Sequence, residues 1–535
     1  MLASTRVSCV ATDVRALGIF IAVAACSGRA PVPVAAPAPA PAPAPVPAPA
    51  PAPIVAPLGA ACDAARSCTP ELACLPLAGG FCSARCEDTA CTGSCVPTPR
   101  FGAICAPPCA TDADCRGDDA FVCDPNWHAC LLPNLAAIIP RACPAQPHRD
   151  PAASAITAIT TDDAPGGSQR SPAAVLTDDG SLVALYSLGD GDGLGSTTTA
   201  PGSAEAHARD PAVARDHAGT IYAAWHELDA NGLALLEVAS SRDRGATWLP
   251  PVIADEPLAC SALAEGACFA PPSIAIGPDP RRRGADILYV VHGGGDVGVR
   301  VLASHDAGAT FSAAATPLAG GATSAAVGSD GRLHVVALSG GPRDGYGSAM
   351  QQVGYAVSAD GGATFAHAAI SARDELLPYY FATPAIALDD RRRILYVAYL
   401  RGGRDAAWDL VIAATRDGGK TWTRAVLGDR CAWHAVPTLA VDPTTGVLHV
   451  AYYDSAGDAG FTHAICTIGA TKCAVLGALD DTPAPMSTVR HAANALGDHA
   501  VLAIDDRARV LHAMWTRTSS AASRIVETVV KLPKR

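Results

Sequence analysis

The chain has 535 residues, of which 49% are hydrophobic, so it is long enough for more than one domain with its own core. Its formal net charge is −12, and the sequence has no basic tail or arginine-rich run of helical character, so nucleic-acid binding is not expected. Its 20 cysteines instead indicate an oxidising compartment outside the cytoplasm.

Residues 1–25 are predicted to be a signal peptide. Arg6 and Arg15 precede an apolar run over residues 16–25, which is too short to span a bilayer. The sequence VAACS at residues 23–27 resembles the lipobox of bacterial lipoproteins, which implies that Cys26 is lipidated. An ordinary cleaved signal with an incidental cysteine is the alternative. The resemblance implies a bacterial cell-envelope protein, periplasmic or surface-exposed, that contacts the membrane only through its lipid anchor.

Residues 26–57 are predicted to form a stalk behind this anchor. Proline alternates with alanine almost throughout residues 31–57, and this pattern favours an extended polyproline II helix that buries nothing. At about 3.1 Å per residue the segment reaches roughly 80 Å.

Residues 58–146 are predicted to be a small disulfide-rich module. Thirteen cysteines lie between Cys62 and Cys143, and no two of them form the CxxC pair of a zinc ribbon. We therefore expect no metal here, and no cofactor anywhere in the chain. The sequence leaves the pairing within the module open.

Further cysteines lie downstream of the module. Cys260 with Cys268 and Cys466 with Cys473 are close enough in sequence to form local bridges. A bridge from the module to Cys431 would complete the pairing.

One eight-residue phrase occurs four times after residue 240, as SRDRGATW (241–248), SHDAGATF (304–311), SADGGATF (358–365) and TRDGGKTW (415–422). The copies start 63, 54 and 57 residues apart, which suits one propeller blade per copy. Ser or Thr and Asp bond nearby backbone groups in a tight turn, glycine takes an unusual φ, and the terminal aromatic tucks under its own hairpin. The Asp and aromatic positions are Asp243, Trp248, Asp306, Phe311, Asp360, Phe365, Asp417 and Trp422.

These octets resemble the BNR or Asp-box repeat of the sialidase superfamily. The resemblance implies an all-β chain with a sialidase-like β-propeller over residues 152–535. A pair of short apolar strands joined by an acidic or glycine turn occurs seven times, which predicts seven blades, with six as the alternative because the first copy is cramped. Residues 155–160 are expected to supply a strand to the last blade and so close the ring.

In this architecture the octets gather at one end of the ring, and the residues just before or after the paired strands gather at the other. Arginine binds carboxylates with two parallel hydrogen bonds, and aromatic rings stack on sugars, so we expect a ligand site at this second end. The candidate binding residues are Arg170, Arg209, His226, His292, Arg343, Arg401, Trp433, His434, Asp454 and Arg517.

Catalytic candidates follow from the resemblance alone. Sialidases clamp the substrate carboxylate with arginines, and the Arg-Ser-Pro phrase at Arg170 stands where their first arginine enters the ring. Tyr379 or Tyr380, activated by Glu227 or Glu375, would be the nucleophile. However, the strand before Asp330-Gly-Arg-Leu, where the family commonly has its glutamate, has no carboxylate.

The sequence therefore predicts a surface-tethered, monomeric lipoprotein whose propeller binds a glycan or an extracellular protein ligand without catalysis. The first alternative is a glycoside hydrolase of the exo-sialidase type. The second is a sortilin-like receptor, although cysteine-rich modules normally follow the propeller in such receptors.

Overall fold

The computed structural model describes residues 54–534 apart from a set of short segments. These segments are 64–65, 76, 78, 87–90, 99–101, 117–120, 125–126, 133–148, 160–168, 190–192, 202–207, 229–232, 256–257, 260–270, 294–297, 340–351, 372–376, 378–382, 403–407, 428–433, 455–459, 482–495, 498 and 519–522. Within the described residues, no helix is long and apolar enough to cross a membrane.

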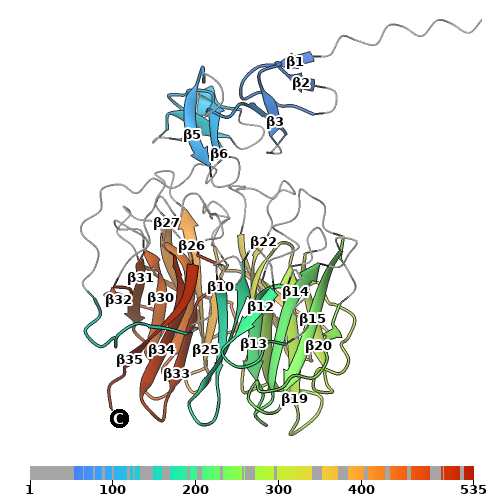
Figure 1. Cartoon of the computed structure of the whole chain (residues 1–535), viewed down its shortest axis with the longest axis vertical. Helices are drawn as coiled ribbons and strands as arrows, with labels where there is room; N and C mark the ends of the chain where they lie inside the picture. The colour runs from blue at the N-terminus through green and yellow to red at the C-terminus, as the bar shows by residue number, and fades with distance from the viewer. Residues whose placement is uncertain are drawn as a thin grey trace, which may run out of the picture. The chain divides into compact units, whose positions relative to one another are not determined.

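The larger part of the described chain is a β-propeller of seven antiparallel sheets (Figure 1). The first four blades, each written from its first strand onward, are as follows: β10 (Gln169–Leu176), β11 (Leu182–Leu188) and β12 (Gly193–Ser196); β13 (Arg209–Arg215), β14 (Ile221–Leu228), β15 (Leu233–Ser241) and β16 (Val252–Ile253), with β17 (Leu258–Ala259) also on β15; β18 (Ser273–Pro278), β19 (Asp286–Gly293) and β20 (Val299–Ser304); β21 (Gly321–Val327), β22 (Leu333–Ser339), β23 (Gln352–Ser358) and β24 (Ala366–Ala369).

Blades 5 to 7 each have four strands. They are β25 (Ala385–Asp389), β26 (Ile394–Gly402), β27 (Trp408–Thr415) and β28 (Thr423–Leu427); β29 (His434–Val441), β30 (Leu448–Asp454), β31 (Gly460–Cys466) and β32 (Cys473–Ala478); β33 (Val501–Asp505), β34 (Val510–Thr518), β35 (Ser523–Lys531) and β9 (Thr157–Ala158). The prediction of an all-β propeller with seven blades is confirmed, and the six-bladed alternative is wrong, because even the cramped first copy forms its own three-stranded sheet.

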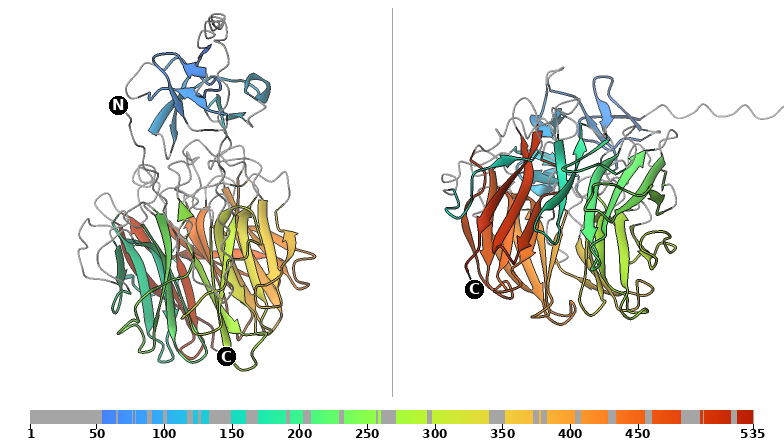
Figure 2. Two further views of the ribbon diagram at one scale, coloured as in Figure 1. Left: turned by 90° about the vertical axis from the view of Figure 1, so that its right-hand side faces the viewer. Right: turned by 60° about the horizontal axis from the view of Figure 1, so that its bottom comes forward.

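The propeller ring is closed by pairing between its earliest strand in the sequence, β9, and its last strand, β35 (Figure 2). Strand β9 lies antiparallel to β35, with Ala158 opposite Val526 and Thr157 opposite Glu527. The prediction that residues 155–160 complete the last blade is therefore confirmed. This pairing covers part of the edge of β35, which would otherwise be open.

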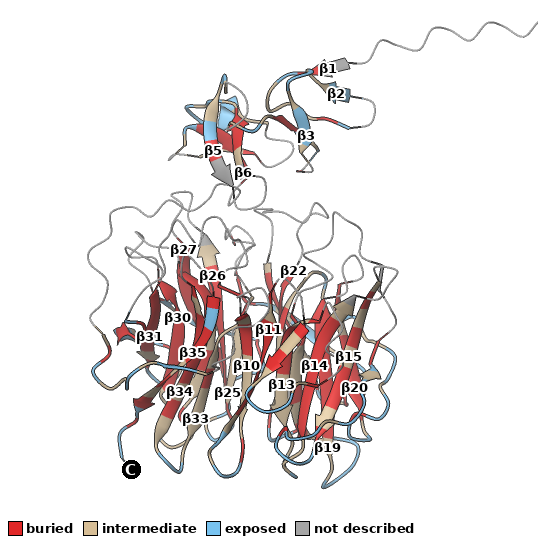
Figure 3. Ribbon diagram, in the orientation of Figure 1, coloured by how far each residue is buried: buried red, intermediate tan, exposed pale blue. Residues whose placement is uncertain are grey.

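The core lies between neighbouring blades, in the middle strands of each sheet (Figure 3). Every residue of β27 and of β30 is buried, because both faces of these strands are covered by the adjoining sheets. Large aromatic side chains such as Trp225, Tyr399 and Trp515 fill the widening gaps away from the axis and are less than 2% exposed. Burial of this kind is the main stabilising contribution to the fold.

The octets all form the same hydrogen-bonded turn. In the second copy, Asp306 accepts bonds from the Ser304 hydroxyl (2.8 Å), the Thr310 amide (2.9 Å) and the Thr310 hydroxyl (2.6 Å). The equivalent bonds occur at Asp243, Asp360 and Asp417.

Glycine is required in the octet both for its backbone conformation and for the space around it, as Gly362 shows. Gly362 has a φ of +83°, which favours glycine, and a Cβ there would lie 3.3 Å from the Tyr289 ring of the preceding blade.

Contacts between turns tie neighbouring blades together at the octet end. Arg281, in the first turn of blade 3, donates to the Asp360 carbonyl of the blade 4 octet at 2.6 Å. Arg507 of blade 7 donates to the Asp178 carbonyl of blade 1 at 2.8 Å, across the point where the ring closes. The octets and the first turns of the blades therefore share one end of the propeller, and the starts of the first strands lie at the other, which we call the loop end.

The disulfide-rich module consists of three consecutive four-cysteine units. In each unit the first cysteine bonds the third and the second bonds the fourth; the pairs are Cys62–Cys74 and Cys68–Cys82, Cys86–Cys95 and Cys91–Cys105, and Cys109–Cys123 and Cys115–Cys130. The third and fourth cysteines of each unit face each other on a two-stranded hairpin; the three hairpins are β3 (Ala73–Leu75) with β4 (Phe81–Ser83), β5 (Ser94–Thr98) with β6 (Gly102–Ala106), and β7 (Val122–Asp124) with β8 (Ala129–Leu131).

The remaining elements of the module are β1 (Ile54–Ala56), which runs parallel to β2 (Arg66–Cys68), and the short 3₁₀ helix η1 (Asp112–Asp114). The rings of Phe81 and Phe121 stack at 5.0 Å and join the first unit to the third.

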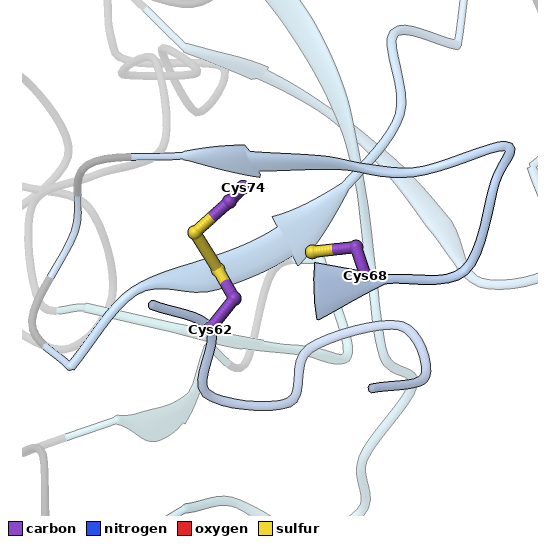
Figure 4. A group of neighbouring side chains, drawn as sticks. All are labelled: Cys62, Cys68 and Cys74. Atoms are coloured by element: carbon purple, nitrogen blue, oxygen red, sulfur yellow. A yellow bond between two sulfur atoms is a disulfide. The ribbon is translucent and has the colours of Figure 1, made fainter. Parts of the chain in front are cut away.

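Sulfur atoms gather in two places in the module, one of which is shown in Figure 4. Cys62, Cys68 and Cys74 lie within 4.8 Å of one another, yet Cys62 is bonded to Cys74, and Cys68 to Cys82. Thiolates are the ligand form of cysteine, so this group is a structural disulfide cluster and not a metal site.

Candidate functional site at the loop end of the propeller

The register of the first two strands in each blade fixes which predicted residues share the loop end. Arg209 lies opposite His226, and His434 lies opposite Asp454. The structure thus places these residues at this end, together with Arg170, His292, Arg401 and Arg517. Arg343, Glu375, Tyr379, Tyr380 and Trp433 lie outside the described residues, as do Cys26, Cys260, Cys268 and Cys431.

A channel of about 220 Å³ runs along the axis and is lined by the first strands of all seven blades. Its wall is made of small and apolar side chains, among them Pro172, Pro211, Pro272 and Pro437, and none of the described residues that line it is charged. His499 is its one imidazole; burial lowers the pKa of His499 to about 4, so its ring is neutral near pH 7. The channel itself therefore offers no clamp for an anion.

The entries into this channel are strained. Ser171, Asp210 and Val436 have φ values of 53°, 52° and 47°, each directly before a proline, and the strand pairing shifts register at each of them. Residues other than glycine seldom occupy this region, and bulges of this kind are common beside binding sites because they redirect a side chain. Here they fix the direction of the arginines that precede Ser171 and Asp210.

Arg170 and Arg209 meet around a buried carboxyl group at the mouth between blades 1 and 2. The Asp210 amide donates to the Ser187 hydroxyl at 2.8 Å, and Arg170 donates to the Gly189 carbonyl. Burial raises the pKa of Asp210, and the Ser171 hydroxyl and the two arginine charges offset this only in part. Both arginines remain partly exposed.

A chain of buried polar groups joins blades 2 and 3. His226 Nε2 lies 3.3 Å from His292 Nδ1, and His292 Nε2 lies 2.8 Å from Asp255 Oδ2. Arg300 binds the same carboxylate through two nitrogens, with 2.6 Å between Arg300 Nη2 and Asp255 Oδ1. Because His292 donates to Asp255 through Nε2, its Nδ1 in the neutral ring accepts from His226.

The pKa values of Asp255 and His226 in this chain of polar groups are both lowered. Burial raises the pKa of Asp255, but the hydrogen bonds from His292 and Arg300 outweigh it and hold the pKa below its usual range. Burial, with the neighbouring His292 and Arg209 charges, moves the pKa of His226 well below its ordinary value. The chain is thus a neutral imidazole beside a compensated ion pair.

Two other predicted arginines are each engaged by a carboxylate, Arg401 within blade 5 and Arg517 across the join between blades 6 and 7. Arg401 Nη2 lies 2.6 Å from Asp409 Oδ2. Arg517 binds Asp480 through Nε (3.0 Å) and Nη2 (2.8 Å) and also contacts Asp481. These two guanidinium groups therefore already have the anionic partner that a ligand carboxylate would supply.

His434 and Asp454 are close but do not form a tight pair. The His434 ring donates through Nδ1 to the Trp408 carbonyl, and its Nε2 lies 3.9 Å from Asp454 Oδ2. Both side chains are nearly buried, with 2% of His434 and 12% of Asp454 exposed.

Glu227, a catalytic candidate, is paired with a second glutamate that the sequence reading missed. Glu237 lies in β15, opposite Trp225 of β14. Trp225 is two residues before Glu227 in the same strand. Burial, followed by the charge of Glu227 and the hydrogen bond with it, raises the pKa of Glu237 to about 7, against a weaker opposing bond from Trp225. Two carboxyl groups in direct hydrogen bond share a proton and leave no room for a sugar between them.

The other residues that sequence reasoning missed are Asp255, Arg300 and Asp480. Asp255 and Asp480 follow the fourth strand of a blade, and Arg300 lies in a third strand, whereas the predicted binding residues flank the first two strands. An acidic residue directly after the last strand of a blade is a signal that would have found both carboxylates.

No protein-family model matches the chain, and no curated protein matches it. Solved structures similar to it include a protein of unknown function from Dyadobacter fermentans, with 14% identity over 69% of this chain and 100% of that chain and a TM-score of 0.40. A Hadza microbial sialidase shares 16% identity over 65% of this chain and 73% of that chain, with a TM-score of 0.37. The Trypanosoma rangeli sialidase shares 14% identity over 68% of this chain and 59% of that chain, with a TM-score of 0.38.

The fold is that of a sialidase-like β-propeller, as its seven radially arranged sheets and its four octet turns define it. Such a fold hosts many activities, so function must come from the site.

Proposed function

We propose that this chain is a surface-tethered lipoprotein whose propeller binds a glycan or an extracellular protein ligand at the loop end, without catalysis. The proposal combines the predicted anchor at Cys26, the Pro/Ala stalk and the partly exposed arginines at the mouth of the channel.

The observation that carries the non-catalytic part is the internal pairing of the clamp candidates. Arg401 is bound by Asp409 and Arg517 by Asp480, whose side chains are 13% and 3% exposed, so displacing either carboxylate would leave it without its arginine at a cost of several kcal/mol. Glu227 is hydrogen-bonded to the Glu237 carboxyl group, which disfavours it as the base for a tyrosine nucleophile.

Arg170 and Arg209 remain as the binding pair at the mouth. They come from adjacent blades, both are partly exposed, and both act on the same buried Asp210. Two guanidinium groups beside one internal carboxyl carry more positive than negative charge, which favours an acidic ligand.

A binding experiment tests this assignment. The full chain is probed on an array of neutral, sialylated and uronic-acid oligosaccharides, and the glycans retained are then titrated by calorimetry. Arg209→Ala is expected to weaken binding at least tenfold, whereas Arg332→Ala, an exposed arginine at the octet end, leaves it unchanged. Equal losses in both variants, or retention of no glycan together with capture of a purified extracellular protein that Arg209→Ala does not weaken, would contradict the assignment of this site.

The tether is tested separately. Radiolabelled palmitate is expected to enter the wild-type chain in a bacterial host and not Cys26→Ala. Label in the Cys26→Ala chain would contradict the proposed anchor without bearing on ligand binding.

A further inference from the structure

Residues 149–158 lie across the join between blades 6 and 7, and we call them the latch. The Asp150 amide donates to the Ala478 carbonyl of blade 6 at 2.9 Å. The Ser154 amide donates to the Val529 carbonyl of blade 7 at 2.9 Å, and the latch ends in β9 on β35. One short segment is therefore bonded to both of the last two blades.

Beneath the latch lies a buried chain of one carboxylate and two imidazoles. His463 Nδ1 lies 2.7 Å from Asp150 Oδ2, and His449 Nδ1 lies 3.0 Å from His463 Nε2. The Asp150 and His463 side chains are 2% and 1% exposed, and His449 is 5% exposed. Only Asp150 belongs to the latch; the two histidines belong to β30 and β31.

The geometry leaves one arrangement of protons for the neutral rings. His463 donates through Nδ1 to the Asp150 carboxylate, so its Nε2 accepts from His449 Nδ1. The two rings are stacked at 5.3 Å with planes 14° apart, so a positive charge on both rings would be repulsive. A proton added to His449 therefore disturbs the chain that ends at Asp150.

The surrounding charges are few and already paired. On the octet side, Arg509 reaches Asp442 (2.7 Å) and Asp506 (2.7 Å), and this group faces His449. On the outer side, Arg149 lies 3.5 Å from Asp481. The titratable groups packed around His449 are thus His463, Asp442, Arg509 and Asp150.

We propose that residues 149–158 are an acid-released latch, held closed by the Asp150–His463–His449 chain, whose opening frees the join between blades 6 and 7 before the other blades unfold. The proposal is independent of the ligand-binding function. Residues 149–158 follow the disulfide-rich module in the sequence, so their release also lengthens the connection to it by about ten residues.

The direction of the pH effect follows from the two shifted groups. Burial, with the charge of His463, lowers the pKa of His449 to about 4 in the closed state. Burial raises the pKa of Asp150, but the bond from His463, the Ala152 amide and the histidine charges hold it below its usual value. Both groups therefore favour the closed latch at neutral pH, and this preference is lost as pH falls from about 6.5 to 4 for His449 and below about 4 for Asp150.

Hydrogen–deuterium exchange of the full chain tests the latch, with protection factors corrected for the intrinsic pH dependence of exchange. If His449 has an ordinary pKa in the open state, protection of the latch amides should fall on the order of 70-fold between pH 7.5 and 4.5. Amides in the middle strands of blade 5, β26 and β27, which contain no histidine, should keep their protection over the same range.

Three variants separate the latch from general acid sensitivity. Asp150→Asn keeps an acceptor for His463 but loses the charge, so the latch amides should exchange on the order of tenfold faster already at pH 7.5. His449→Gln keeps a donor for His463 but does not titrate, so the acid-induced loss should shrink to less than about tenfold. His334→Gln is the matched control, because His334 is a buried histidine of blade 4 with a pKa also lowered to about 4 by burial, and its ring lies 2.7 Å from the Tyr355 hydroxyl, away from the latch.

The outcomes are exclusive. Loss of protection confined to the latch and β35, and reduced by His449→Gln but not by His334→Gln, supports the proposal. Latch protection that is unchanged at pH 4.5, or that is lost to the same extent in all blades, would overturn it.

Discussion

Removing the Asp255 carboxylate is the change that most directly probes how the loop end is held together. Asp255→Ala leaves the Arg300 guanidinium and the His292 ring without their common partner, in a place where Asp255 and His292 are 4% and 1% exposed. Breaking one side of a buried ion pair costs 3–5 kcal/mol, and because Arg300 is 15% exposed and can reach some water, we expect about 3 kcal/mol. Asp330→Ala is the control: Asp330 and Arg332 are 3.5 Å apart and about half exposed, so the loss should be at most about 0.5 kcal/mol.

Urea denaturation of the full chain, followed by the fluorescence of its seven tryptophans, measures both losses. Arg300→Met added to Asp255→Ala should recover part of the loss, because the stranded charge is gone, and the coupling between the two sites should be about 2 kcal/mol. Since the pKa of Asp255 lies below its usual range, its contribution is present above about pH 4 and lost as pH falls further. A loss for Asp255→Ala no larger than that for Asp330→Ala would refute the buried network.

Two further substitutions and one disulfide assignment test the fold. Gly362→Ala should destabilise the chain by about 1–2 kcal/mol in the same assay, because φ is +83° there and the new Cβ would press on Tyr289; a neutral result would contradict the octet geometry. Cys466→Ser should cost about 2 kcal/mol under oxidising conditions and nothing after reduction, since the bridge closes only a short turn. Cys143 is the one module cysteine outside the six internal pairs, so peptide mapping should find it bonded to Cys431; a free thiol at Cys431 would contradict this.

The octet turns and the number of blades could be predicted because each depends on residues close together in the sequence. The octets specify their turns because Asp306 and its equivalents bond groups only two to four residues away. The seven strand pairs specify seven blades because each pair is a hairpin within one stretch of chain. Closure by β9 was predictable from the number of strands: the sequence of the last blade contains three, and the fourth could come from the start of the propeller.

The partners of the loop-end residues were not predictable in the same way. Strand ends place Arg517 and His292 at this end, but Asp480 lies 37 residues from Arg517 and Asp255 lies 37 residues from His292. Such pairs depend on how neighbouring blades pack, so the strand pattern within a single blade does not give them. The disulfide pairing of the module was equally hidden, because the alternation of first with third and second with fourth cysteine becomes visible only once the three hairpins are in register.

The central claim, that the loop end binds without catalysis, is tested most directly by turnover of a fluorogenic sialoside by the full chain. We predict that hydrolysis by the wild-type chain does not exceed hydrolysis by Arg170→Ala at any pH between about 4.5 and 7.5. Multiple turnovers by the wild-type chain that Arg170→Ala abolishes, with the variant still folded, would contradict it and establish the glycoside hydrolase.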